Sequence, residues 1–248
     1  MALPKVSIIT IVYNGVSTLE KTIQSIAALT YPNVEYIVVD GGSKDGTVEL
    51  IQRYESNISK WISEPDKGSY DAMNKGLAMA SGDYVWFINS GDETAEPNIL
   101  NKTFALCNEA DIYYGDTMLI DNDGHEIGKR RLSPPKKLTW KDFRKGMVVS
   151  HQSFICSRSI AGNYNLAYRF SADFEWCLQA LKKADRVCNT ELTLSRFLEG
   201  GLTKKNIVPG LKERFKIMRQ NYGFIATTAT HIVLGIKLCW FILMNKRF

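Results

Sequence analysis

Largely apolar, β-branched segments alternate with helical patterns through the first 93 residues, and this alternation constrains the fold more than any other feature of the sequence. Val6–Val12 (VSIITIV) and Val34–Val39 (VEYIVV) have the composition of strands that are buried on both faces. The predicted strands are 6–12, 34–39, 58–62 and 84–88, and the predicted helices between them are 17–29, 47–54 and 69–80. Strands that alternate with helices form right-handed βαβ units, so the sequence predicts a parallel sheet.

After Asp92 the alternation ends, and the sequence predicts a mixed second half. Residues 97–107 predict a helix that begins at a proline. Residues 111–131 predict a hairpin that turns at Asn122-Asp123-Gly124. A strand over 148–158 and an amphipathic helix over 173–183 complete this half.

Polar side chains follow each of the four predicted strands. They are Tyr13 and Asn14, then Asp40, Gly41 and Ser43, then Asp66 and Lys67, and finally Asn89, Ser90 and Asp92. Ligands of open parallel sheets bind beyond the carboxyl ends of the strands, so we expect these side chains to form one site. The glycine-rich motifs of dinucleotide and P-loop sites are absent after the first strand.

The same edge is rich in carboxylates, which suits a diphosphate whose charge is neutralised by a metal ion. Mg²⁺ binds through one or two carboxylates together with phosphate oxygens, and Asp92 fits that role. Asp40 could accept hydrogen bonds from a uracil or a ribose.

Three stretches, VDGGSKDGT, SEPDKGSYDAMNKG and FINSGD, resemble the family-2 glycosyltransferases of the GT-A fold. The similarity is strongest to the branch that builds bacterial exopolysaccharides and surface glycans, including the colanic acid transferases, and it covers roughly residues 5 to 205. It implies an α/β fold with a mainly parallel central sheet flanked by helices and a C-terminal helical tail. It also implies a glycosyltransferase domain over 1–208, with a nucleotide-binding half of about 1–93 and an acceptor half of about 94–208, followed by a tail over 209–248.

The resemblance assigns roles to individual residues. The implied donor-binding residues are Thr10, Tyr13, Asn14, Asp40, Gly41, Ser43, Asp66, Lys67, Tyr70, Asn74, Asn89 and Ser90. The family holds its metal with an acidic motif after the fourth strand. Here Asn89 or Ser90 stands where an aspartate is usual, so we expect Asp92 to bind Mn²⁺ or Mg²⁺, with Asn89 or water completing the site.

Inversion at an anomeric carbon needs a base for the attacking hydroxyl, and the family places a carboxylate at the start of a helix in the second half. In SADFEWCLQ the matching residue is Asp173, with Glu175 close by. SHQSFICSR and RFLEGGLTKKN also resemble family segments, which implies that His151, Gln152, Gly200 and Gly201 line the acceptor or diphosphate side.

Four polar residues of these segments, Asp45, Asp92, His151 and Asp173, also have a purely structural interpretation. Asp45 and Asp173 could cap the helices that begin near them. His151 could be a hydrogen-bonded core histidine, and Asp92 could be a turn residue.

The net charge and the cysteine content limit the partners and the cellular compartment that can be expected. The net charge of +5 is mild and lies mostly in the last third of the chain, so nucleic acid is not an expected partner. The five cysteines include no CxxC pair, which argues against a disulfide framework or a zinc site and suits a reducing compartment. The N-terminal run reads as a strand and not as a signal peptide.

The tail from Pro209 carries one apolar stripe, Leu211, Phe215, Met218 and Tyr222, among basic residues, and 224–244 is apolar except at positions such as Lys237. The first interpretation is a helix lying on an anionic membrane surface. The second is a helix docked on the protein's own core or on a second subunit of a homo-oligomer. The third is a membrane span, which Lys237 disfavours.

Together these features predict an inverting, metal-dependent glycosyltransferase at the cytoplasmic face of the cell membrane. It would move a sugar from a nucleotide sugar, in first place a UDP-sugar, to a lipid-linked or surface-glycan acceptor. One alternative is a nucleotidylyltransferase, although its basic, glycine-rich loop is absent after the first strand. The other is a catalytically weak nucleotide-sugar-binding protein, which the departure at Asn89 keeps open.

Overall fold

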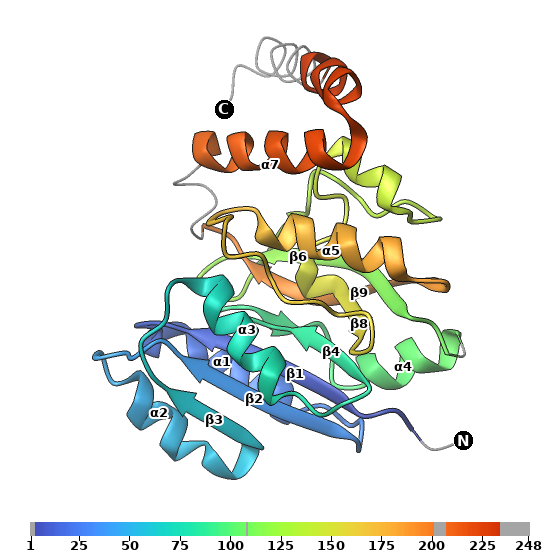
Figure 1. Cartoon of the computed structure of the whole chain (residues 1–248). Coiled ribbons are helices and arrows are strands. Elements are labelled where there is room, and N and C mark those ends of the chain that lie inside the picture. Colours follow the sequence, from blue (N-terminus) through green and yellow to red (C-terminus); the bar gives the residue numbers. More distant parts are fainter. Residues whose placement is uncertain (1–2, 108, 201–206, 234–248) are drawn as a thin grey trace.

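The computed structural model describes residues 3–107, 109–200 and 207–233 and, within them, one mixed sheet (Figure 1). The strands are β1 Val6–Val12, β2 Val34–Asp40, β3 Lys60–Ser63, β4 Tyr84–Phe87, β5 Glu93–Thr94, β6 Ile112–Ile120, β7 Glu126–Lys129, β8 Phe154–Ser157 and β9 Val187–Leu198. The helices are α1 Val16–Ala27, α2 Thr47–Arg53, α3 Ser69–Met79, α4 Ile99–Leu106, α5 Ala172–Lys183 and α7 Ile207–Tyr222, with short 3₁₀ turns η1 Glu55–Asn57, η2 Trp140–Lys145 and η3 His151–Ser153.

The first half is the predicted parallel sheet. β1 pairs in parallel with β2 on one side and with β4 on the other, and β2 pairs in parallel with β3. β8 then inserts antiparallel between β4 and β6, and β9 runs parallel to β6. The order is β3-β2-β1-β4-β8-β6-β9-β5, with β7 forming the predicted hairpin with β6.

Helices cover both faces of this sheet, which explains the uninterrupted apolar character of β1. Ile8 and Ile9 point to opposite faces, and both have no exposed surface. Ile9 joins a core that includes residues of α3 and α5, whereas Ile8 joins a core that includes residues of α1, α2 and α4.

Two parts of the second half differ from the prediction. The strand expected over 148–158 begins only at Phe154, because residues before it close a 3₁₀ turn in which the Ser153 N–H donates to the Ser150 carbonyl at 3.0 Å. The long strand β9 was not predicted. Its sequence, VCNTELTLSRFL, mixes polar and apolar residues, and its two neighbours, β6 and β5, are distant in sequence.

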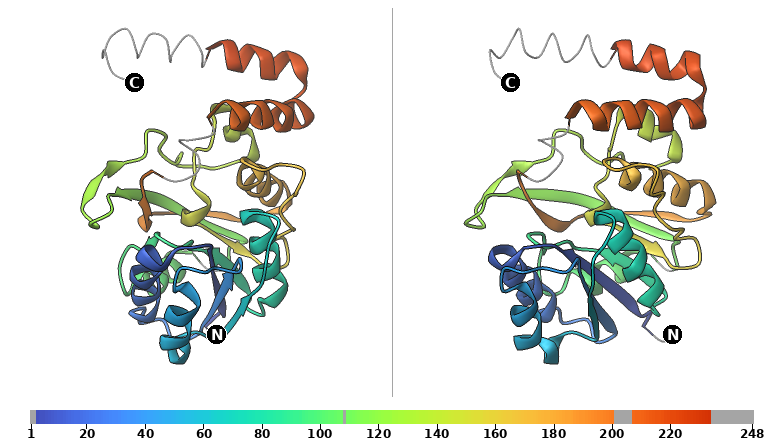
Figure 2. Two further views of the ribbon diagram at one scale, coloured as in Figure 1. Left: turned by 90° about the vertical axis from the view of Figure 1, so that its left-hand side faces the viewer. Right: turned by 60° about the vertical axis from the view of Figure 1, so that its left-hand side comes forward.

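The first part of the expected tail is a packed element of the domain. α7 buries Ile217 completely and leaves Met218 only 2% exposed, and both join the core on the α5 face. The Tyr222 ring stacks on the Trp140 ring of η2 at 5.4 Å between ring centres, and its hydroxyl donates to the Trp140 carbonyl. Figure 2 shows α7 at the end of the molecule opposite to α1 and α2. The docked interpretation therefore describes α7.

The helical residues 224–233 continue beyond α7, and 234–248, with Lys237, lie outside the described residues. Within the described ranges, no helix combines the length and the apolar character that crossing a bilayer would need.

The expectation that the cysteines form no disulfide was wrong for one pair. Cys107, at the end of α4, is bonded to Cys188 in β9, across a sequence separation of 81 residues. Spacing along the sequence could not reveal the pair, because the fold brings α4 against β9. Cys156 and Cys177 are free and buried.

Candidate functional site

The loops after β1 and β2 are joined by hydrogen bonds, as expected for neighbouring carboxyl ends of parallel strands. The Asn14 N–H donates to the Ser43 hydroxyl at 2.7 Å, and the Lys44 N–H donates to the Asn14 side-chain oxygen at 3.0 Å. Asn14 has a φ of 47°, which an asparagine tolerates better than most residues. The two loops therefore form one rigid rim.

Tyr13 and Asp66 face each other across Gly41 on this rim. Tyr13 is 65% exposed, and a side chain at position 41 would collide with the Asp66 carboxylate and touch the Tyr13 ring. Gly41 thus allows the Asp66 carboxylate and the exposed Tyr13 ring to approach the same stretch of backbone. An aromatic face can stack on a planar base, and a carboxylate can accept a hydrogen bond from an N–H group.

Asp40 lies beneath this rim and not on its surface. It has no exposed surface, and it accepts hydrogen bonds from the N–H groups of Gly42 and Ser43 at 3.0 and 2.9 Å and from the Ser63 hydroxyl at 2.6 Å. Its carboxylate shapes the loop that carries Gly41, and it does not face the space above.

Two hydrogen bonds connect the loop after β4 to η3. The Asn89 amide nitrogen lies 3.2 Å from His151 Nε2, and the Gln152 amide nitrogen donates to Asp92 Oδ2 at 2.9 Å. Asp92 Oδ1 also accepts from the Leu198 N–H in β9 at 3.2 Å. Asp92, the predicted metal residue, therefore contacts Gln152 directly, and Asn89 on the same loop contacts His151.

Asp92 is nearly buried, with 4% of its surface exposed. Burial raises the pKa of Asp92 to about 6, although the hydrogen bond from Gln152 and the nearby His151 act in the opposite direction. The carboxylate is thus held in a place where its charge is costly, and a cation beside it would relieve that cost.

Asp173 lies in the first turn of α5, whose N-cap is Ser171, so Asp173 is not the capping residue. The Tyr70 hydroxyl donates to Asp173 Oδ1 at 3.0 Å, and His151 Nδ1 lies 3.6 Å from Asp173 Oδ2. The Asp173 side chain keeps 21% of its surface exposed. Burial alone would raise the pKa of Asp173, but the interaction with His151 and the charge of Arg214 outweigh burial and lower the pKa.

Arg214 and Tyr164 are members of this neighbourhood that sequence reasoning missed. Arg214 lies on α7, with its guanidinium carbon 5.9 Å from the centre of the Phe174 ring. It was counted with the basic surface of the tail, and only the docking of α7 brings it near Asp173. The Tyr164 ring stacks on Tyr70 at 5.5 Å between ring centres.

Several predicted donor-binding residues have their polar groups inside the protein. Thr10 has no exposed surface, and its hydroxyl donates to the Ile88 carbonyl at 2.6 Å. The Asn74 amide both donates to and accepts from the Tyr164 backbone, at 2.9 and 2.7 Å. These two residues shape the surroundings of the site through β4 and the 164 loop.

The remaining predicted residues lie at the margins. Ser90 bonds Thr18 of α1 through their hydroxyls at 2.9 Å, and Lys67 is exposed at the start of the 67–71 turn. Gly200 is exposed with a φ of 120°, a backbone conformation that favours glycine, and Gly201 lies outside the described residues. Asp45 accepts hydrogen bonds from the N–H groups of Thr47 in α2 and Val16 in α1, but the N-cap residues of these helices are Gly46 and Gly15, so Asp45 is not the capping residue itself.

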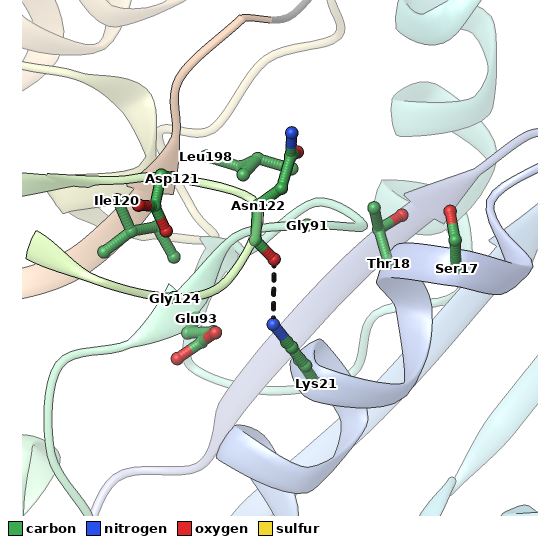
Figure 3. A pocket seen from close by; sticks show the side chains of 10 residues that line it. All are labelled: Ser17, Thr18, Lys21, Gly91, Glu93, Ile120, Asp121, Asn122, Gly124 and Leu198. Atoms are coloured by element: carbon green, nitrogen blue, oxygen red, sulfur yellow. Dashed lines mark hydrogen bonds between the residues drawn. The ribbon is translucent and has the colours of Figure 1, made fainter.

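A small pocket lies on the other side of the loop after β4, between α1 and the turn of the β6–β7 hairpin (Figure 3). Lys21 reaches from α1 and donates to the Asn122 carbonyl at 2.9 Å. Thr18, Gly91 and Leu198 complete the part of the lining nearest the strand ends. The turn of the β6–β7 hairpin therefore contacts α1 and lies beside the loop after β4, which carries the predicted metal ligand Asp92.

The donor set around β4 fits a hard cation. The Asn89 side-chain oxygen is buried and has no hydrogen-bond partner, and the Asp92 carboxylate lies on the same loop. Carbonyl and carboxylate oxygens are the ligands that Mg²⁺ and Mn²⁺ prefer. A second group, Asp121, Asp123 and His125, could also offer one ligand atom each within 4.8 Å, but it is a largely exposed hairpin turn in which the Asp121 carboxylate accepts backbone N–H groups.

Comparison with known proteins gives consistent matches. The family model described as Glycosyl transferase family 2 matches residues 7–165. An uncharacterized glycosyltransferase of Mycobacterium tuberculosis, Rv1514c, is 38% identical over 184 residues, which cover 71% of this chain and 69% of that protein. The PGL/p-HBAD biosynthesis glycosyltransferase Rv2957 of the same species is 30% identical over 185 residues, with coverage of 71% and 69%.

Among solved structures, S. aureus TarS 1-349 in complex with UDP-GlcNAc matches with a TM-score of 0.68 at 18% sequence identity. The match covers 87% of this chain and 65% of the TarS chain. At this identity the likeness concerns the fold alone, and it confirms the predicted GT-A architecture.

Proposed function

The chain belongs to glycosyl transferase family 2, and from this premise we propose that it transfers a sugar from a UDP-sugar to a lipid-linked or surface-glycan acceptor in bacterial polysaccharide biosynthesis. The observation that carries the proposal is the line of contacts from Asn89 through His151 to Asp173. It joins the strand edge where a nucleotide sugar would bind to the carboxylate that would act as base.

The donor's base would lie against the exposed Tyr13 ring, on the side of Asp66. Its ring would stack on Tyr13, and an N–H of the base would donate to Asp66, whose Oδ2 lies nearest to Gly41. A uracil offers such an N–H, which supports UDP as the nucleotide. Asn14 and Ser43 would keep the rim in place.

The diphosphate would extend from this rim toward the loop after β4. Members of this family commonly use a divalent metal ion, and Asn89 and Asp92 would hold it here. Such an ion would offset the charge that develops on the departing diphosphate. Lys67, exposed beyond the end of β3, would add a positive charge on the side of the rim formed by the loops after β1 and β2.

The transfer itself would invert the anomeric carbon. The acceptor hydroxyl oxygen forms the new bond to that carbon, the bond to the diphosphate oxygen breaks, and its electron pair leaves with UDP. The hydroxyl proton passes to Asp173, which its lowered pKa keeps ionised at neutral pH. Tyr70 donates to one carboxylate oxygen, and the acceptor hydroxyl would approach the other, which lies 3.6 Å from His151 Nδ1.

The acceptor would be presented at a membrane surface. The C-terminal helices expose apolar side chains, among them Leu211 at 50%, Phe224 at 60% and Ile225 at 85%, and Lys212 and Arg219 lie on the same segment. Apolar and basic side chains together suit an anionic surface such as the inner face of the cell membrane. A second copy of the chain could cover the same residues, and measurement of the oligomeric state separates the two.

The test is acceptor-dependent release of the nucleotide from a panel of UDP-, GDP-, dTDP- and CMP-sugars, with a lipid-diphosphate-linked saccharide as acceptor. We expect turnover with at least one UDP-sugar and inversion of the anomeric configuration by NMR. Binding of UDP without turnover would favour the catalytically weak binding protein. Turnover with retention would refute the role of Asp173 as base.

A further inference from the structure

His151 stands between the two halves of the candidate site. Its Nδ1 faces Asp173 Oδ2 at 3.6 Å, and its Nε2 faces the Asn89 amide nitrogen at 3.2 Å. Only 7% of the residue is exposed. A side chain that uses both ring nitrogens in this way fixes the relative position of its two partners.

The ring has little freedom to turn away. It packs edge-on against Phe87 of β4, with ring centres 6.3 Å apart. The backbone of η3 is also anchored, because the Trp86 indole N–H donates to the Gln152 carbonyl at 2.8 Å and Ser153 donates to the Asp116 carbonyl at 2.7 Å. The imidazole is thus presented from a rigid turn.

The partners determine where a neutral imidazole carries its proton. An amide nitrogen only donates, so Nε2 must be the acceptor toward Asn89, and the ring proton is then on Nδ1, which faces the carboxylate of Asp173. If the amide were reversed, Nε2 would donate and the bare Nδ1 lone pair would face that carboxylate. The arrangement with the proton on Nδ1 is therefore the favourable one for a neutral ring.

This arrangement also sets the direction of the Asn89 side-chain oxygen. Because the amide nitrogen is held by His151, the oxygen is the end that is left without a partner, and it is buried at the predicted metal loop. An aspartate at position 89 would instead present an acceptor to the Nε2 lone pair. The departure from the family's usual aspartate is thus matched to the histidine beside it.

We propose that His151 is a positioning residue that orients the Asp173 carboxylate through Nδ1 and the Asn89 side-chain oxygen through Nε2. The proposal rests on the proposed function. In that function the Asn89 oxygen acts on the donor and its metal ion, whereas Asp173 acts on the acceptor. It predicts that the two ring nitrogens affect different kinetic constants.

Two conservative substitutions separate the two contacts. In His151→Asn the amide nitrogen can replace Nδ1 toward Asp173 but nothing reaches Asn89, whereas in His151→Gln the amide oxygen can replace Nε2 toward Asn89 and the contact with Asp173 is lost. We expect His151→Asn to keep kcat near that of the wild type and to raise the donor KM about tenfold. We expect His151→Gln to keep the donor KM and to lower kcat by about 10- to 100-fold.

His151→Ala should both raise the donor KM and lower kcat. The matched controls are His231→Asn and His231→Gln, in the helical residues 224–233, and they should change neither constant. Calorimetry of UDP binding with Mn²⁺ gives a second readout, in which His151→Asn weakens binding and His151→Gln does not. If the Asn and Gln variants lose kcat and KM in the same proportion as the Ala variant, or if both match the wild type, the proposal is overturned. If the wild type turns over no donor, the proposed function fails, and calorimetry alone then decides the role of His151.

Discussion

Replacing Asp92 with asparagine should change how the stability of the protein depends on pH. The pKa of Asp92 is raised from 3.8 to about 6 by burial, so the unfolded chain loses this proton first as the pH rises. The native state is then penalised progressively between about pH 4 and 6, and the full penalty is present above pH 6. At 1.36 kcal/mol per pKa unit, the penalty amounts to about 3 kcal/mol.

Asp92→Asn removes this penalty but also weakens the contact with Gln152, because a hydrogen bond to a charged group contributes about 1.5–3 kcal/mol. We therefore expect the free energies of unfolding of the two proteins to be similar at pH 7. The wild type should nevertheless lose about 3 kcal/mol relative to the variant as the pH rises from about 4 to 7.

The assay is urea denaturation of both proteins across this pH range in the presence of a chelator, with the free energy of unfolding extrapolated to water. Asp173→Asn is the matched control of opposite sign. The pKa of Asp173 is lowered, so its contribution to stability is present above the unfolded value near 3.8 and is lost as the pH falls below it. Parallel curves for the wild type and Asp92→Asn would refute the view that burial of the Asp92 charge is only partly compensated by its hydrogen bonds.

Four further predictions concern the chemistry and the architecture. Asp173→Asn should lower turnover by about 10² to 10⁴ with UDP binding nearly unchanged, whereas Glu175→Gln should have a much smaller effect; a proportional loss of donor affinity would make Asp173 a donor ligand. Excess chelator should abolish turnover and added Mn²⁺ should restore it, so full activity in chelator would refute the metal proposal. Ile217→Ala should cost about 2–5 kcal/mol in urea denaturation, because the side chain is fully buried, and an unchanged midpoint would refute the docking of α7. Truncation after Tyr222 should release the protein from anionic liposomes and leave UDP binding intact, and flotation of the truncated chain would place the membrane surface elsewhere.

The parallel half of the fold could be predicted because its signals are local. The apolar run Val6–Val12 and the polar residues directly after it are contiguous in sequence, and their structure depends on burial on both faces and on a strand end. Asp92 could be singled out for the same reason, whereas Asp173 could be singled out only through the resemblance to family-2 glycosyltransferases. Their contacts could not be predicted, because Gln152 and His151 reach them from a turn that was predicted as part of a strand.

Burial and local contacts could not be predicted from the sequence. Asp40 is predicted to bind the donor, and that role stays a prediction; the structure adds that the loop after it covers its carboxylate and donates N–H and hydroxyl groups to it. In α7 the helical spacing of Leu211 and Met218 suggested one apolar face, but the surface of α5 and η2 selects Ile217 and Met218 and leaves Leu211 half exposed. The spacing of apolar residues identifies faces of a helix that could be buried. The surface against which the helix packs determines which of these faces is buried.

The attachment of α7 has a consequence for the order in which the protein matures. The Glu213 carboxylate accepts the N–H groups of Arg169 and Phe170, both at 2.8 Å, and the Ser171 hydroxyl donates to the Gly210 carbonyl, so α7 fastens the chain that leads into the helix of Asp173. A ribosome delivers the chain from its N-terminus, and the parallel half can fold while the rest is still being made. The edge of β1 to β4 that we propose as the nucleotide-binding edge can thus form early in synthesis, whereas Asp173, the proposed base, is fixed in place only after α7 has emerged. The proposed site would therefore be completed only when nearly all of the described chain has been synthesised.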